Sequence, residues 1–76
     1  MKIIDNVKTG KRIMEARKRR GVTVRNCAQR LHVSEQAVYN WQTGKCLPSL
    51  EVFVNLGDLL GLSFEKMLVC EERREL

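Results

Sequence analysis

A chain of 76 residues has room for one domain, which excludes a barrel enzyme and any enzyme with two lobes around a cleft. Hydrophobic residues make up 43% of the chain and aromatic residues 5%, which suits a small helical core. Residues 1–48 carry eleven Lys and Arg against three acids, a net charge of +8, whereas residues 49–76 carry three against six, a net charge of −3. A basic surface over the first two-thirds of a chain is the pattern expected of a nucleic-acid binder.

No apolar run approaches the roughly 18–20 residues of a membrane-spanning helix, and the opening MKIIDNVKTGKR turns polar too early for a signal peptide. We therefore expect a cytoplasmic protein with no membrane partner. Cys27, Cys46 and Cys70 are widely spaced and His32 is the only histidine, so the usual zinc-binding spacings do not occur. We expect reduced thiols, no metal and no cofactor.

The first predicted element is a basic helix from about Val7 to Arg20, which ends before Gly21. Thr23 is the expected N-cap of a second helix, which carries apolar residues at helical spacing and ends near His32. Two short helices separated by three or four residues, here LHVS, form the helix-turn-helix signature.

The third predicted helix covers about residues 35–43, with Ser34 as its N-cap and Gly44 as the left-handed residue that ends it. Ser49 is the expected cap of a fourth helix and Ser63 that of a short fifth one. Gly57, in the middle of the fourth helix, predicts the close approach of a neighbouring helix.

The predicted fold is all-α: a compact five-helix domain over residues 7–70, with residues 1–6 and 71–76 as short tails and no strand. The helix-turn-helix consists of its second and third helices. Most of the apolar stripe on the last two helices is expected to be core, and what remains exposed is a candidate dimer face. The candidates for that face are Met67, Leu68 and Val69.

The third helix has two chemically different sides. At 100° per residue, Val38 and Trp41 lie within about 60° of each other and are expected in the core. Gln36 and Asn40 lie almost opposite, with Tyr39 beside them. Because amide side chains at the start of such a helix read purine edges in a major groove, the polar side is a candidate DNA-reading surface.

Three motifs extend this interpretation over most of the chain. The first is Thr23-x-x-x-Cys27-Ala28-x-x-Leu31-x-Val33-Ser34, the second Val38-x-x-Trp41-x-x-Gly44-Lys45-x-Leu47-Pro48-Ser49, and the third LLGLSFEKML. From about Gly10 to Leu68 the sequence resembles the lambda-repressor and Cro-like (XRE-type) helix-turn-helix family. The resemblance implies a five-helix fold and sequence-specific binding of double-stranded operator DNA. It also implies a role as a transcriptional regulator, and a repressor is the role we expect. Such proteins commonly bind as homodimers.

The resemblance also implies roles for individual residues. Base reading falls on Glu35, Gln36 and Asn40, with Tyr39 and Ala37 at the periphery. Phosphate binding falls on Thr23, Val24, Thr43 and Lys45. Unpaired amides at a helix N-terminus and the ammonium of Lys45 both suit a phosphate backbone.

The sequence departs from the family at two positions, Val24 and Gln42, and Glu35 places a carboxylate at a DNA-facing position. Val24 stands where the family often has Gln, so we expect the phosphate clamp to be either weakened or moved to Arg25 or Asn26. Gln42 stands where the family favours Glu, so that Arg17 can hydrogen-bond to it without an ion pair and is freer to meet a phosphate. Glu35 can accept a hydrogen bond from a cytosine amino group, yet as a carboxylate it repels phosphates.

An enzyme is not expected, because one histidine, no paired carboxylates and no glycine-rich phosphate loop provide no catalytic set. No small-molecule ligand is expected either. The alternative to a DNA-binding regulator is a protein-interaction module, such as an antitoxin or adaptor, that uses the same fold to hold a partner. The acidic last third of the chain favours this alternative.

Overall fold

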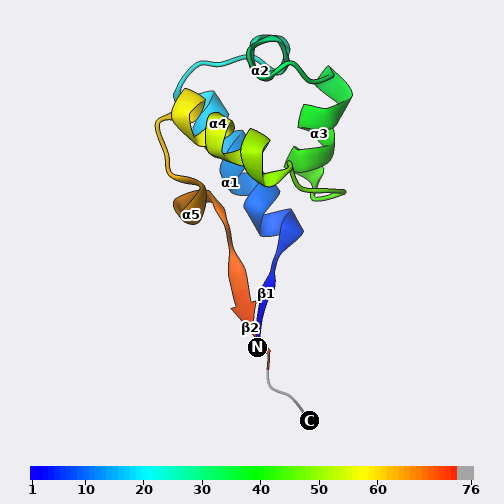
Figure 1. Cartoon of the computed structure of the whole chain (residues 1–76), viewed down its shortest axis with the longest axis vertical. Helices are drawn as coiled ribbons and strands as arrows, with labels where there is room; N and C mark the ends of the chain where they lie inside the picture. Colours follow the sequence, from blue (N-terminus) through cyan, green and yellow to red (C-terminus); the bar gives the residue numbers. More distant parts are fainter. Residues whose placement is uncertain (74–76) are drawn as a thin grey trace.

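The computed structural model describes residues 1–73 and shows a body of five helices with a narrow two-stranded ribbon projecting from one end (Figure 1). Its principal extents are 44 × 22 × 20 Å. In chain order the elements are β1 (Lys2–Ile4), α1 (Asn6–Arg19), α2 (Val24–Leu31), α3 (Glu35–Thr43), α4 (Leu50–Leu60), α5 (Phe64–Met67) and β2 (Cys70–Glu72). The five helices confirm the predicted helical fold, and the ribbon adds to it.

Side-chain capping fixes where four of the helices begin, and at the start of α1 the carboxylate of Asp5 accepts a hydrogen bond from the amide of Lys8 at 2.9 Å. The hydroxyls of Thr23, Ser34 and Ser49 accept hydrogen bonds from main-chain amides three residues further on, at 3.1, 3.0 and 3.4 Å. Each bond pairs an amide that the first helical turn leaves without a partner. Ser63 is the N-cap residue of α5, as predicted, but its side chain makes no capping hydrogen bond.

The core lies between the five helices, each of which contributes buried side chains. Ile13 of α1, Val38 of α3 and Leu56 of α4 are fully buried. Trp41 is 4% exposed, which confirms it as a core residue. A close approach is present at Gly57, but the turn after α4 makes it rather than a neighbouring helix, since a Cβ there would lie 2.5 Å from the carbonyl oxygen of Leu62.

Met67 is fully buried in this core, which corrects its assignment to an exposed apolar patch. Its methyl group lies beneath Gly57, 3.6 Å from where a Cβ would be. Leu68 and Val69 are half-buried. The most exposed apolar side chains of the helical body downstream of α3 are instead on α4, where Leu50 is 70% and Val54 43% exposed.

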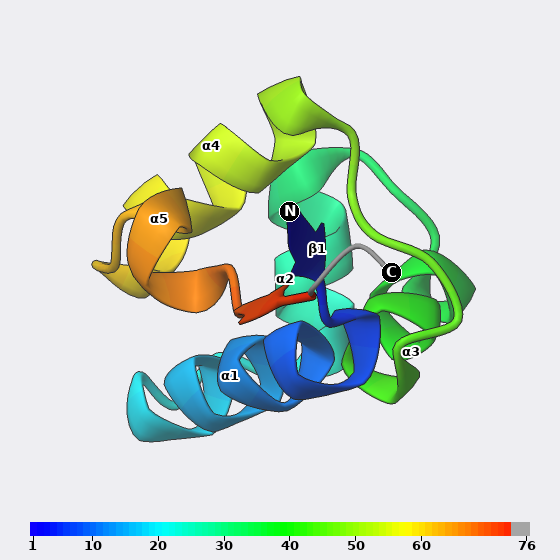
Figure 2. The same cartoon turned by 90° about the horizontal axis from the view of Figure 1, so that it is seen from below.

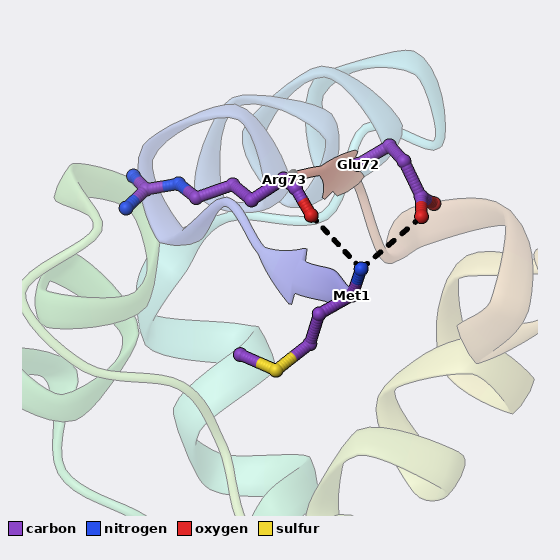
Figure 3. A network of polar contacts seen from close by, with 3 residues as sticks. All are labelled: Met1, Glu72 and Arg73. Atoms are coloured by element: carbon purple, nitrogen blue, oxygen red, sulfur yellow. Dashed lines mark hydrogen bonds and ion pairs between the residues drawn. The ribbon is translucent and has the colours of Figure 1, made fainter. Parts of the chain in front are cut away.

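Residues 1–6 and 71–76 are expected from the sequence to be tails, but their described parts pair with each other, so the expectation of no strand is wrong; residues 74–76 lie outside the described part of the chain. β1 and β2 run antiparallel with Ile3 opposite Glu71, and the amide of Asp5 extends the contact to the carbonyl of Val69 at 2.7 Å. Figure 3 shows the amino group of Met1 between the carboxylate of Glu72, at 3.3 Å, and the carbonyl of Arg73, at 2.9 Å. Strands of three residues are too short to show a two-residue period in sequence.

Close packing of α1 against α3 sets the position of α3. A Cβ at Gly10 would overlap the main-chain carbonyl oxygen of Trp41 and lie 2.8 Å from that of Gln42, so only glycine allows the two helices this distance. Further along α1, Nε of Arg17 donates to Oε1 of Gln42 at 2.8 Å. No helix within residues 1–73 is long and apolar enough to cross a membrane.

Candidate nucleic-acid interface

The turn between α2 and α3 is short and closed by main-chain hydrogen bonds. His32 adopts a left-handed conformation with φ 55°, and the amide of Val33 donates to the carbonyl of Ala28 at 3.0 Å. Ser34 then begins α3. Cys27 and Ala28 are buried, so α2 is held against the body and α3 leaves the turn at a fixed angle. This is the helix-turn-helix that the sequence predicts.

The exposed side of α3 carries the predicted base-reading residues, and we call it the reading face: Glu35, Gln36, Tyr39 and Asn40. Val38 and Trp41 hold the opposite side of the helix in the core. Gln36 and Glu35 are exposed, Tyr39 is 48% exposed and Asn40 is half-buried. The structure therefore brings the four residues together on one surface.

Three hydrogen bonds organise side chains on and beside the reading face. Nε2 of Gln36 donates to Oδ1 of Asn40 at 3.0 Å. The hydroxyl of Thr43 approaches the main-chain carbonyls of Tyr39 and Asn40 at 3.1 and 3.3 Å, so its hydrogen is directed into the helix. A phosphate contact by Thr43 would require this hydroxyl to rotate.

An ion pair links the beginnings of α2 and α3. Nε of Arg25 lies 3.9 Å from Oε2 of Glu35, with side chains 77% and 50% exposed. At this distance and exposure the pair contributes little to stability. It does place a guanidinium beside the one carboxylate of the reading face, which partly offsets the repulsion between Glu35 and a phosphate.

The remaining predicted phosphate-binding residues differ in how many of their hydrogen-bond donors are already bonded within the protein. Lys45 is exposed just beyond α3, and its amide is anchored to the carbonyl of Asn40 at 2.9 Å. The hydroxyl of Thr23 accepts the capping bond and keeps its own hydrogen for a ligand. Arg17 is half-buried, with Nε on Gln42 and Nη1 on the carbonyl of Val22 at 2.9 Å, which leaves fewer of its donors for a phosphate.

Sequence reasoning missed the two side-chain pairs of this surface. The bond from Gln36 to Asn40 spans four residues, a spacing at which side chains meet on a helix and from which the contact was predictable. The pair of Arg25 with Glu35 crosses from one helix to the next, so it depends on the angle of the turn and has no signal in the sequence.

The thiols and acids show no second chemical centre in the described residues. Among residues 1–73, no three His, Cys, Asp or Glu side chains are grouped as a metal site would require. Burial raises the pKa of the Cys27 thiol, and the nearby charge of Arg17 opposes this effect. Cys27 is therefore a packed thiol rather than a reactive one.

In helix-turn-helix domains the second helix of the motif buries one side in the core and exposes polar groups on the other, and α3 has this arrangement. The chain belongs to the helix-turn-helix domain family, which matches residues 10–67. The helix-turn-helix family predicted from the sequence motifs is thereby confirmed. No curated protein sequence matches the chain significantly.

Solved structures share this fold. The restriction-modification controller protein C.AhdI from Aeromonas hydrophila has a TM-score of 0.76 and 24% identity, over 83% of this chain and 96% of that one. The clp gene regulator ClgR from Corynebacterium glutamicum gives the same TM-score and identity, over 82% of this chain and 66% of that one. The FeII enzyme HppE has a TM-score of 0.77 at 15% identity, but only 34% of its chain is matched. These likenesses establish the fold.

Proposed function

We propose that this protein binds double-stranded DNA sequence-specifically and regulates transcription, acting as a repressor that occupies operator DNA. The observation that carries the proposal is the reading face, where Gln36, Tyr39 and Asn40 are presented by a helix whose other side is locked in the core. Amide groups in this place suit base edges in the major groove. We further propose that the protein acts in the cytoplasm, without enzymatic activity and without a cofactor.

The proposed phosphate contacts surround this helix. Thr23 and Arg25 lie at the N-terminus of α2, where unpaired amides favour an anion, and Thr43 and Lys45 lie at the end of α3. Contacts on both sides of the recognition helix would fix its register in the groove, while base contacts would supply the sequence preference. For Arg17 we propose a supporting role through Gln42, with a phosphate contact as a secondary one.

We also propose that the protein binds its operator as a homodimer. Leu50 and Val54 lie one helical turn apart on α4, and they support an interface with a second copy because association would bury their exposed apolar side chains. Two copies related by a twofold axis would read half-sites about one helical turn, roughly 34–36 Å, apart. Light scattering of the free and DNA-bound protein measures the stoichiometry.

Selection from a random pool of duplexes at moderate salt tests the DNA-binding proposal. An enriched inverted repeat is the expected result. Retention without enrichment would contradict sequence-specific binding and leave a general attraction between the basic surface and DNA. No retention would contradict DNA binding altogether and favour the alternative, a protein-interaction module on the same fold.

A further inference from the structure

The β1–β2 ribbon has two outer edges, and both lie clear of the five helices because the ribbon projects from one end of the helical body (Figure 1). Inside the ribbon the amide of Asp5 bonds the carbonyl of Val69. In an antiparallel pair, residues that bond the partner strand alternate with residues whose main-chain groups point outward. The amides and carbonyls of Lys2 and Ile4 therefore face away from β2, along the outer edge of β1. An edge of this kind is a template for a further strand.

The two edges differ in chemistry. β1 consists of one lysine and two isoleucines, and Ile4 is 42% exposed. β2 contains two glutamates. Lys2 lies opposite Glu72 within the ribbon, so its positive charge already has an acidic neighbour. The edge of β1 is thus mainly apolar with its charge balanced, whereas the edge of β2 is acidic.

We propose that β1 pairs with β1 of a second copy of this chain, antiparallel and centred on Ile3, so that two ribbons form one four-stranded sheet. In this register Lys2 lies opposite Ile4 of the second copy, and the outward amides and carbonyls of these residues bond across the contact. Ile3 meets its own counterpart at the twofold axis, so no like charges lie directly opposite each other. Pairing also removes the apolar edge from water.

The other pairings of these edges are less favourable. Pairing of β2 with β2 of a second copy, centred on Glu71, would place two carboxylates directly opposite each other. Pairing of β1 with β2 of a second copy would leave one edge of each kind open, so that association would continue into chains. Pairing through β1 stops at two copies, because only acidic edges remain. This contact uses neither Leu50 nor Val54, so it is separate from the interface proposed on α4.

Disulfide trapping tests the register directly. Serine first replaces the exposed thiols Cys46 and Cys70, and Leu50→Glu removes the contact proposed on α4. Ile3→Cys is then introduced. In the proposed sheet the two cysteines form a non-hydrogen-bonded pair with Cα atoms about 4.5 Å apart, which a disulfide spans. With oxidised glutathione as the oxidant, a covalent dimer should form in proportions that rise with protein concentration.

Glu71→Cys in the same background is the matched control, because Glu71 lies opposite Ile3 in the ribbon and holds the corresponding position on the other edge. It should remain monomeric under the same oxidant. Trapping of Glu71→Cys in place of Ile3→Cys would overturn the proposed pairing. Failure to trap Ile3→Cys at any protein concentration would overturn it as well, and would show that Lys2 and the short strand keep the edge free of partners.

A second measurement needs no cross-link. Light scattering of the Leu50→Glu protein should show a monomer–dimer equilibrium, and Ile4→Pro should abolish the dimer because it removes an outward amide of β1 while the bonds inside the ribbon remain. Cys70→Pro is its control, since Cys70 lies opposite Ile4 on β2, and it should leave the dimer unchanged. Growth of the protein into chains, or equal effects of the two prolines, would contradict pairing through β1. These results are independent of DNA binding, which the selection described above measures.

Discussion

Arg17 on α1 and Gln42 on α3 are joined by a hydrogen bond of 2.8 Å between Nε and Oε1, in a half-buried position. A second donor of the same guanidinium, Nη1, bonds the carbonyl of Val22, just before α2. One side chain therefore ties α1 both to α3 and to the segment that precedes α2. The position of the reading face depends on this guanidinium as well as on the core.

We expect Gln42→Ala to lower the free energy of unfolding by about 1–2 kcal/mol, because it leaves a half-buried guanidinium with one donor unpaired. Gln42→Glu should restore or exceed wild-type stability by forming an ion pair with Arg17, and that gain should shrink with added salt. Urea denaturation measures both. Gln29→Ala, an exposed amide on α2, serves as control. Equal stability of Gln42→Ala and the wild type would contradict the bracing role.

Capping offers a sharper comparison between two serines. Ser34→Ala should cost about 1 kcal/mol of stability, because it removes the 3.0 Å bond to the amide of Ala37 at the start of α3. Ser63→Ala should cost much less, since the Ser63 side chain makes no capping bond. Thermal denaturation of the two variants side by side measures the difference. Equal losses of stability in the two variants would contradict a stabilising role of the capping hydrogen bond of Ser34.

Most of the fold was predictable because its signals are local. Thr23, Ser34 and Ser49 mark helix starts, and the apolar spacing of Val38 and Trp41 marks the buried side of α3. The β1–β2 ribbon was not predictable, because its three-residue strands lie at opposite ends of the sequence and carry no period. Which residues form the reading face followed from helical geometry. The ion pair between Arg25 and Glu35 did not, because it crosses from α2 to α3 and depends on tertiary structure.

The contact of α1 with α3 at Gly10 should be intolerant of a single methyl group. Gly10→Ala should lower stability by about 2 kcal/mol, because the added Cβ meets the main-chain oxygens of Trp41 and Gln42, which cannot move aside as a side chain can. Gly21→Ala is the control: with φ +69° and open space around it, it suffers backbone strain of about 1 kcal/mol without a clash. A smaller loss at Gly10 than at Gly21 would contradict the close packing.

Asp5 should make stability depend on pH in the acid range. The hydrogen bond from the main-chain amide of Lys8, with a smaller effect of the Glu71 side chain, holds the pKa of the Asp5 carboxyl below its ordinary value. A lowered pKa in the folded state means that the unfolded chain binds the proton more readily, so stability is full above about pH 4 and falls as the pH drops. Asp5→Asn should be less stable than the wild type at pH 7, and the difference should narrow by pH 3. A difference independent of pH would contradict the charge effect.

Lys45 should act on DNA affinity without acting on sequence preference. Its ammonium lies just beyond the C-terminus of α3, where a phosphate backbone would pass, and it carries no information about bases. Lys45→Ala should weaken binding to all duplexes alike, on the order of a few-fold to tenfold, and reduce the slope of log affinity against log salt by about 1. Fluorescence anisotropy at several salt concentrations measures both.

Lys66→Ala is the control for Lys45→Ala, because it removes the same charge from α5. Figure 2 shows α5 and α3 on opposite sides of the helical body. The general attraction of the protein to DNA falls with net charge in both variants, whereas a phosphate contact is lost in only one. Equal losses of DNA affinity for the two substitutions would show that Lys45 contributes only through the net charge of the protein. A change in the preferred sequence on replacing Lys45 would instead make it a base-reading residue.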